Sequence, residues 1–186
     1  WYGKGETPMV GAVFSRKALA DKEHPSYATY VGSIGGPQSA VQVRIDRYDG
    51  SWADAQEVGE VGVKGPSVMA GYWRNPDATQ LAIRNGWLWT GDMGCWHDSG
   101  FITLKDRSKD MIISGGSNIY PREIEEVLLK LEGVQEAAVV GERHPEWGES
   151  VVAFVVAEPG VTDAMLDQQC LDELARFKRP KRYVRV

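Results

Sequence analysis

The segment from Gly86 to Arg122 constrains the fold of this 186-residue chain most strongly, because two kinds of structural pattern meet within it. Residues 93–105 hold two apolar runs separated by Asp98-Ser99-Gly100, which predicts a β-hairpin. Further along, Pro121 is a residue well suited to the first position of a helix. We therefore expect the chain to change here from strands to a region that mixes helices and strands.

Residues 1–106 are expected to form mainly strands and loops. The run from Val41 to Ile45 alternates at period two, and the run from Val58 to Val63 does so more weakly. Asn75 or Asp77 can cap a short helix that extends to about residue 83. Because no other helical pattern is present to cover a sheet, this part is interpreted as a β-rich, distorted barrel-like portion of a larger, truncated domain.

The remaining residues predict a small α+β domain of order βαββα. Its first helix begins at Pro121, carries an apolar stripe at helical spacing and is closed by Gly133. Strands are expected at residues 134–140 and 151–157. A second helix, capped by Thr162 or Asp163, is expected to carry apolar residues as far as Phe177. The boundary is placed between residues 107 and 108, which gives domains 1–107 and 108–186.

The composition excludes several classes of function. A net charge of −5 argues against a nucleic-acid partner, and no apolar run is long enough for a membrane span. Cys95 and Cys170 lie far apart, no Cys-x-x-Cys is present, and the three histidines are scattered, so a metal site of Cys and His has little support. A reducing, cytoplasmic setting is the prediction.

Asp92 and Arg107 are the first pair of candidate site residues. If residues 93–105 fold back as a hairpin, the two side chains approach each other. A fixed carboxylate can accept from two adjacent hydroxyl groups of a ribose, and a guanidinium can donate to ribose and phosphate oxygens. The alternatives are a turn aspartate that bonds its own backbone and an arginine in a surface ion pair.

Three further patterns remain open between a structural and a functional role. The glycines of Ser114-Gly115-Gly116-Ser117 allow either a close approach to a ligand or a plain hairpin turn. Glu6 is either a Mg²⁺ ligand or a solvated glutamate. Trp147 and the run from Phe177 to Arg182 form either an aromatic and basic surface or a packed ring and a solvated tail.

Taken together, these residues resemble the adenylate-forming enzymes, which include acyl- and aryl-CoA synthetases, firefly-type luciferases and peptide-synthetase adenylation domains. Tyr2-Gly3-Lys4-Gly5-Glu6 resembles the family's Tyr-Gly-x-Thr-Glu, and Trp89-Thr90-Gly91-Asp92 resembles its Tyr/Trp-x-Thr-Gly-Asp. Residues 106–126 resemble its hinge and glycine-loop motif, and Phe177-Lys178-Arg179-Pro180 resembles the run before its final motif. The resemblance covers essentially the whole chain.

The resemblance implies an ATP-dependent reaction in which a carboxylate attacks the α-phosphate and the acyl-AMP then reacts with a thiol, usually that of CoA. In its nucleotide site, Asp92 and Arg107 would bind the ribose, Tyr2 would stack near adenine, and Glu6 would hold Mg²⁺. Lys109 would be the hinge about which the small domain rotates.

For the thiol half-reaction, the resemblance implies contacts with CoA. Gly115 and Gly116 would line the pantetheine tunnel, and Trp147, Phe177 and Arg179 would contact the CoA nucleotide. The expected reaction is that of an acid–CoA ligase, with a fatty or related acid and CoA as substrates.

The sequence also departs from the family pattern. Gly5 stands where the family has Thr, and neither the glycine-rich phosphate loop nor the catalytic lysine of the final motif is present. The fragment is therefore expected to contain no catalytic residue, to need the missing N-terminal part of the same polypeptide and to be inactive alone. The alternatives are an adenylation domain that loads a carrier protein and a non-catalytic nucleotide-binding or interaction module.

Overall fold

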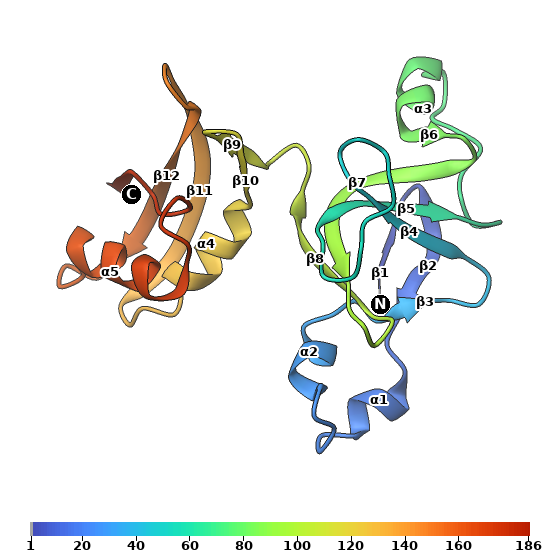
Figure 1. Cartoon of the computed structure of the whole chain (residues 1–186), viewed down its shortest axis with the longest axis horizontal. Helices are drawn as coiled ribbons and strands as arrows, with labels where there is room; N and C mark the ends of the chain where they lie inside the picture. Colours follow the sequence, from blue (N-terminus) through green and yellow to red (C-terminus); the bar gives the residue numbers. More distant parts are fainter. Residues whose placement is uncertain (1) are drawn as a thin grey trace. The chain divides into compact units, whose positions relative to one another are not determined.

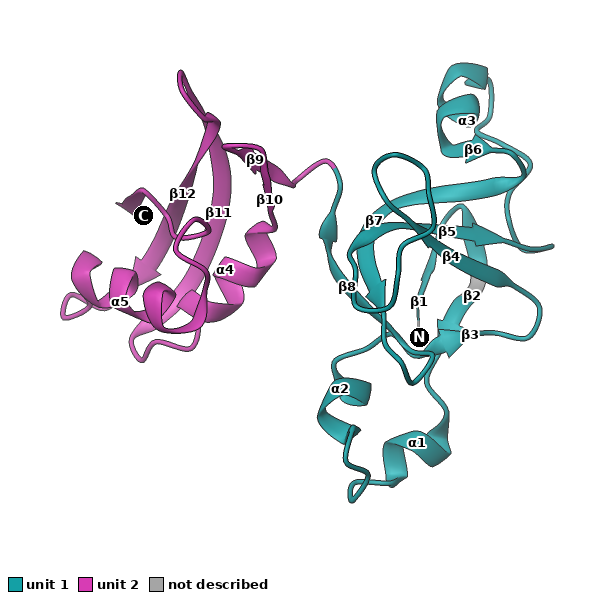
Figure 2. Ribbon diagram, in the orientation of Figure 1, with its two compact units in different colours: residues 1–108 teal, residues 109–186 magenta. Residues whose placement is uncertain are grey.

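A computed structural model describes residues 2–186, apart from the side chains of Met9 and Val10. The chain divides into two compact units, residues 1–108 and 109–186, shown in different colours in Figure 2. This division falls one residue after the boundary expected from the sequence.

The first unit is built from two antiparallel sheets that curl into a half-barrel (Figure 1). The smaller sheet has the order β1-β2-β3, and the larger has the order β4-β5-β7-β6, with β8 paired to the other part of β7. The strands of the smaller sheet are β1 (Tyr2–Lys4), β2 (Thr7–Val13) and β3 (Gly36–Pro37). Those of the larger sheet are β4 (Gln42–Asp46), β5 (Gly59–Lys64), β6 (Ile83–Arg84), β7 (Trp87–Trp96) and β8 (Ile102–Arg107).

Two features predicted for this unit are confirmed. The hairpin is formed by β7 and β8, and it is longer than the predicted segment because the strands extend to Trp87 and Arg107. The short helix is α3 (Pro76–Ala82), and the side chain of Asn75 caps it by accepting a hydrogen bond from the Ala78 N–H.

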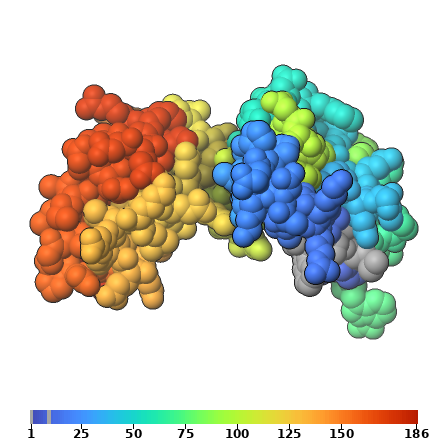
Figure 3. All heavy atoms as spheres, turned by 90° about the horizontal axis from the view of Figure 1, so that it is seen from below, coloured from blue at the N-terminus to red at the C-terminus, as the bar shows by residue number. Residues whose placement is uncertain are grey.

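The expectation of only one helix in this unit is wrong, because α1 (Arg16–Ala20) and α2 (Tyr27–Val31) are also present. Neither helix has a buried residue, and the part of the chain that contains α1 lies on the surface of its unit (Figure 3). A five-residue helix without a buried face has no apolar stripe, so periodicity could not indicate it.

A close contact across the larger sheet explains one glycine. Gly62 on β5 lies between Arg44 on β4 and Trp89 on β7, as register partner of both. A Cβ atom at Gly62 would lie 3.0 Å from the Trp89 ring. The ring lies between two guanidinium groups, those of Arg44 at 5.5 Å and Arg84 at 5.3 Å from its centroid. Gly62 thus leaves room for a cation–π arrangement.

The second unit is a small α+β domain around one sheet of order β10-β9-β12-β11, with β13 added in parallel beside β12. Its strands are β9 (Ile112–Ser114), β10 (Ser117–Ile119), β11 (Val134–His144), β12 (Gly148–Ala157) and β13 (Arg182–Arg185). Its helices are α4 (Pro121–Leu128) and α5 (Asp163–Glu173). The two helices and the sheet enclose a common core of aliphatic side chains that includes Ile124, Leu128 and Leu166.

The observed order of this unit is ββαββαβ, so the predicted βαββα lacked the three-residue strand β10 and the last strand β13. Two helix ends also differ from the prediction. Helix α4 stops at Leu128, before Gly133, which was expected to close it. Helix α5 stops at Glu173 because Leu174 is extended, with φ −121° and ψ 155°, so Phe177 lies outside it. The α+β class itself is confirmed. In the part of the chain that the structure describes, no helix has the length and apolar character that a membrane crossing requires.

Candidate functional site

Asp92 lies at an irregular point of the larger sheet. Glu60 pairs with Met93 and Gly62 pairs with Trp89, so the single residue Val61 faces the three residues between Trp89 and Met93. Gly91 adopts a φ of +71° within this bulge. Bulges redirect side chains, and here Asp92 is directed inward until only 7% of the residue is exposed.

Three side chains surround the Asp92 carboxylate. The Tyr2 hydroxyl donates to Oδ2 at 2.5 Å, and the Lys4 ammonium donates to the same oxygen at 3.2 Å. Arg107, the register partner of Asp92 across the hairpin, has its Nε 3.7 Å from Oδ1. The structure therefore brings Asp92 and Arg107 together, as the hairpin pattern predicted, while their functional roles stay predictions.

Tyr2 and Lys4 reach Asp92 from β1, where they lie two residues apart and so share one face of the strand. Burial, together with the hydrogen bond to Asp92, raises the pKa of Tyr2 well above its usual range. The hydroxyl therefore stays protonated and remains a donor. The Tyr2 residue is only 8% exposed, and the predicted stacking of its ring near adenine stays a prediction.

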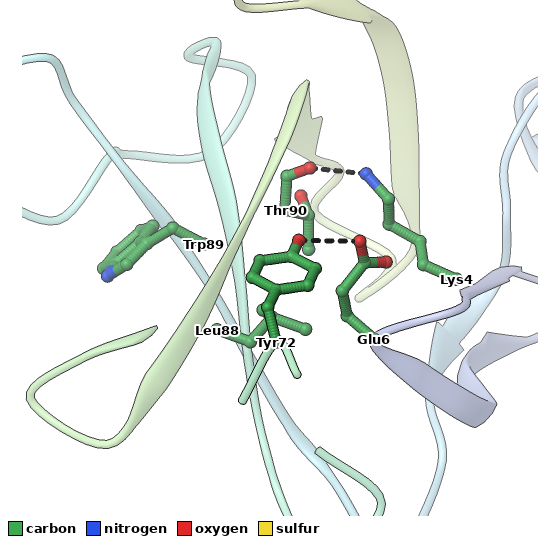
Figure 4. Close-up of a pocket in the computed structure, with 6 residues that line it drawn as sticks. All are labelled: Lys4, Glu6, Tyr72, Leu88, Trp89 and Thr90. Carbon is green, nitrogen blue, oxygen red and sulfur yellow. Dashed lines mark hydrogen bonds between the residues drawn. The ribbon is translucent and has the colours of Figure 1, made fainter. Parts of the chain in front are cut away.

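Beside this cluster is a small open pocket (Figure 4). Its lining residues are Lys4, Glu6, Tyr72, Leu88, Trp89 and Thr90. Figure 4 shows Glu6 facing the Tyr72 hydroxyl, which donates to Oε1 at 2.8 Å, while the Trp89 ring turns away from the other side chains. This hydrogen bond is the main cause of a lowered pKa of the Glu6 carboxyl.

Glu6 is thus held as an anion at the edge of a pocket, where its carboxylate can bind a cation. The described residues contain no group of three or more His, Cys, Asp or Glu side chains that could bind a metal ion. Because Mg²⁺ is commonly bound by one or two carboxylates together with substrate phosphates and water, a single glutamate fits a nucleotide-bound ion and not a site made by protein alone.

The remaining predicted residues lie in the second unit, of which Lys109 is the first residue. Gly115 and Gly116 have φ values of +57° and +78° and connect β9 to β10. Two residues of positive φ between paired strands form a type I′ hairpin turn, so the structural alternative explains both glycines. A ligand contact at these glycines stays a prediction.

The other residues predicted to contact CoA are two exposed aromatic residues and one arginine that forms an ion pair. Trp147 is 42% exposed and stacks on His144 with 4.5 Å between ring centroids. Phe177 is 49% exposed. Arg179 forms an ion pair with Asp167 at 2.8 Å, so part of its guanidinium is occupied within the unit.

Two residues that contact the predicted site residues were not themselves predicted. They are Lys4, beside Asp92, and Tyr72, beside Glu6. Lys4 had a local signal, because it is two positions from Tyr2 and therefore on the same strand face. Tyr72 contacts Glu6 across 66 positions of sequence, and no local pattern indicates such a contact.

Comparison with known proteins relates this chain to a family. Residues 123–186 match the AMP-binding enzyme C-terminal domain. The chain is 48% identical over 154 residues to a 2-succinylbenzoate–CoA ligase of Bacillus mycoides, covering 83% of this chain and 32% of that protein. A ligase of the same name from a Geobacillus species is also 48% identical, over 160 residues.

Solved structures agree with these relatives. The o-succinylbenzoate CoA synthetase MenE of Bacillus subtilis, in complex with the acyl-adenylate intermediate OSB-AMP, superposes with a TM-score of 0.87 at 37% identity. The superposition covers all of this chain and 36% of that protein. ATP-bound MatB of Rhodopseudomonas palustris has a TM-score of 0.76 at 38% identity, with 83% of this chain covered and 32% of MatB.

The chain belongs to the adenylate-forming acyl-CoA synthetases, and it corresponds to their C-terminal portion. It spans about a third of the length of the relatives that it matches. These relatives give no support to the expected fatty acid substrate, since they are named for 2-succinylbenzoate, an aromatic dicarboxylate.

Proposed function

We propose that this chain is the C-terminal portion of an AMP-forming acid–CoA ligase that acts on 2-succinylbenzoate. The observation that carries the proposal is the buried Asp92 carboxylate, which lies beside the Lys4 ammonium and the Arg107 guanidinium. The proposal is supported by two relatives named 2-succinylbenzoate–CoA ligase, whose aligned residues are nearly half identical to those of this chain.

In the proposed reaction, one carboxylate of the acid attacks the α-phosphate of ATP, and pyrophosphate leaves. The thiol of CoA then attacks the acyl-AMP, and AMP leaves as the thioester forms. Asp92 accepts a hydrogen bond from the ribose, and Arg107 donates to an oxygen of the same nucleotide. Both groups hold the nucleotide in place while the α-phosphate is attacked.

Glu6 would hold Mg²⁺ together with the phosphates, and the ion, when bound, neutralises charge that develops on them. Tyr72 keeps Glu6 anionic and oriented through its hydrogen bond. Neither residue needs to move a proton in this scheme.

In the second unit, the proposed CoA contacts are Trp147, Phe177 and Arg179, with Gly115 and Gly116 beside the pantetheine arm. Exposed aromatic rings can stack on the adenine of CoA, and an arginine can bind its phosphates. Lys109, the first residue of this unit, is the proposed hinge between the two half-reactions.

The activity requires, in the same polypeptide, the region equivalent to the upstream two thirds of the relatives. We expect residues 1–186 alone to show no exchange between ATP and pyrophosphate. Robust exchange by the isolated chain would contradict this division of the catalytic groups.

The test uses the complete polypeptide that carries these residues, with thioester formation measured on 2-succinylbenzoate, ATP and CoA. Asp92→Asn keeps the size of the side chain but removes its charge, so AMP binding, measured by calorimetry, is expected to weaken by about 10- to 100-fold. The matched control is Asp98→Asn, which lies in the exposed turn between β7 and β8. Equal affinity in both variants would refute the role of Asp92, and activity on a fatty acid but not on 2-succinylbenzoate would refute the substrate.

A further inference from the structure

The turn that carries Trp147 is short, and one side chain binds its backbone. Strands β11 and β12 are paired up to His144 and Gly148, so only three residues connect them. Pro145, the first of these, has no N–H group. The N–H groups of the other two, Glu146 and Trp147, both donate to Nδ1 of His144, each at 3.3 Å. One ring nitrogen is thus the acceptor for both N–H donors of the turn.

Trp147 is held on two sides. The His144 ring stacks on the indole ring, with 4.5 Å between the centroids and 12° between the planes. On the other side of the residue, the N–H of Gly115 donates to the Trp147 carbonyl at 2.9 Å, which joins the turn to the β9–β10 connection. His144 therefore contacts both the backbone and the ring of Trp147, and Gly115 contacts the backbone alone.

We propose that His144 is a positioning residue for the CoA half-reaction. Through Nδ1 it holds the turn in the conformation that presents the Trp147 ring to the CoA nucleotide. The inference rests on the proposed function, because it concerns a ring to which a CoA contact is assigned there. His144 does not need to touch CoA in this role. A ring that is already held in place loses less conformational freedom when the ligand binds.

The exposure of the turn separates this role from a role in folding. Trp147 is 42% exposed, and Glu146 is exposed as well. In a variant without the acceptor, water can replace Nδ1 as the partner of both N–H groups, so the free energy of unfolding should change little. The turn is then no longer held in one conformation, and CoA has to order it on binding. The loss should therefore appear in the affinity for CoA and not in stability.

The experiment measures the KM for CoA in thioester formation by the complete polypeptide, together with the rate of ATP–pyrophosphate exchange, a reaction that does not involve CoA. His144→Ala removes both the acceptor and the ring. The KM for CoA is expected to rise about 2- to 10-fold, as for the ordering of one side chain on binding. The exchange rate should stay that of the wild type. A general defect in folding would lower both activities and so would not give this split.

Two further variants separate the acceptor from the ring. His144→Asn keeps an oxygen that can accept from N–H groups further along the turn, as asparagine does in an Asx turn, so the KM for CoA should return to near the wild-type value. His144→Phe keeps a ring that can stack on Trp147 but has no acceptor, so its KM should match that of His144→Ala. A KM in His144→Asn as high as in His144→Ala, or a wild-type KM in His144→Phe, would overturn the role of Nδ1.

His24 offers a matched control in the first unit. It is half-buried, as His144 is, and its Nδ1 also accepts from a backbone N–H two residues further on, that of Ser26 at 3.1 Å. Its ring lies 4.8 Å from that of Tyr30. His24→Ala should leave the KM for CoA unchanged. An equal rise in this variant would overturn the inference, because the effect would then not depend on the turn that carries Trp147.

Trp147→Ala separates the inference from the proposed function. A raised KM for CoA in this variant, with a wild-type KM in every His144 variant, would overturn the inference alone. An unchanged KM in Trp147→Ala would overturn the contact of that ring with CoA, and the inference with it. A wild-type polypeptide that forms no thioester from 2-succinylbenzoate and CoA would overturn the proposed function and the inference together.

Discussion

Gly91 is the residue on which the orientation of Asp92 depends, and replacing it with alanine separates backbone strain from steric clash. Its φ is +71°, within the bulge of β7, and its N–H donates to Glu60 Oε1 at 3.0 Å. A Cβ atom at this position would meet only the Ser108 Oγ, at 3.7 Å, which is an ordinary contact. The effect of Gly91→Ala is therefore conformational.

The left-handed backbone region costs a residue with a side chain about 1–2 kcal/mol relative to glycine. Because no clash adds to this term, the free energy of unfolding of residues 1–108 should fall by about 1–2 kcal/mol. Alternatively, residue 91 of the variant leaves the left-handed region, which removes the bulge and shifts the register of β7. A shift by one residue moves a side chain to the other face of a sheet, so Asp92 would leave Tyr2 and Lys4.

Urea unfolding followed by tryptophan fluorescence measures the first outcome, and calorimetry with AMP measures the second. Gly5→Ala is the control, because a Cβ atom there has no heavy atom within 4 Å and the backbone is not in the left-handed region. The control should lose no stability. If Gly91→Ala matched the wild type in both stability and AMP affinity, the argument that the bulge orients Asp92 would be refuted.

Three further predictions concern other parts of the structure. Tyr72→Phe should raise the pKa of Glu6 toward its usual range, as followed by carbon NMR of the carboxyl group, because the hydrogen bond that lowers it is gone. Since that pKa is lowered in the folded protein, ionised Glu6 stabilises the fold above its usual pKa, and the contribution is lost as pH falls through the lowered value. Gly62→Ala should lower the free energy of unfolding by about 1–3 kcal/mol, measured in urea, because its Cβ would lie 3.0 Å from the Trp89 ring. Cys170 is fully buried and burial raises its pKa, so its thiol should react with a disulfide reagent only after unfolding.

Each of these three predictions has a control variant or an outcome that would contradict it. Tyr48→Phe, at a residue that is 98% exposed, should leave the pKa of Glu6 unchanged, and an equal shift in both variants would contradict the role of Tyr72. Gly160→Ala should be neutral, because nothing lies within 4 Å of its Cβ. Rapid reaction of Cys170 in the native protein would show that the core of the second unit opens far more often than its burial implies.

Local patterns predicted those elements whose buried face is periodic in sequence. The β7–β8 hairpin followed from two apolar runs around Asp98-Ser99-Gly100, and α4 followed from Pro121 and an apolar stripe. By contrast, α1 and α2 bury nothing and carry no stripe. The end of α5 also escaped prediction, because apolar residues continue beyond Glu173 while the backbone becomes extended.

In the candidate site, too, local sequence patterns predicted some contacts and not others. Asp92 and Arg107 could be placed side by side because a hairpin determines which of its residues face each other. The contacts of Lys4 with Asp92 and of Tyr72 with Glu6 join segments 88 and 66 positions apart, and they depend on how the two sheets curl together. Without a register between those sheets, sequence spacing alone could not show that Tyr2 and Lys4 contact the Asp92 carboxylate.

The row formed by Arg44, Gly62 and Trp89 ties three positions on different strands to one another. A larger residue in the middle of the row removes the space that the indole ring occupies, and a side chain without a ring at the end takes from Arg44 and Arg84 the cation–π contact that they share at Trp89. During divergence, the middle and end positions should therefore change together: proteins that keep the large aromatic residue should keep glycine beside it, and those that lose the one are free to lose the other.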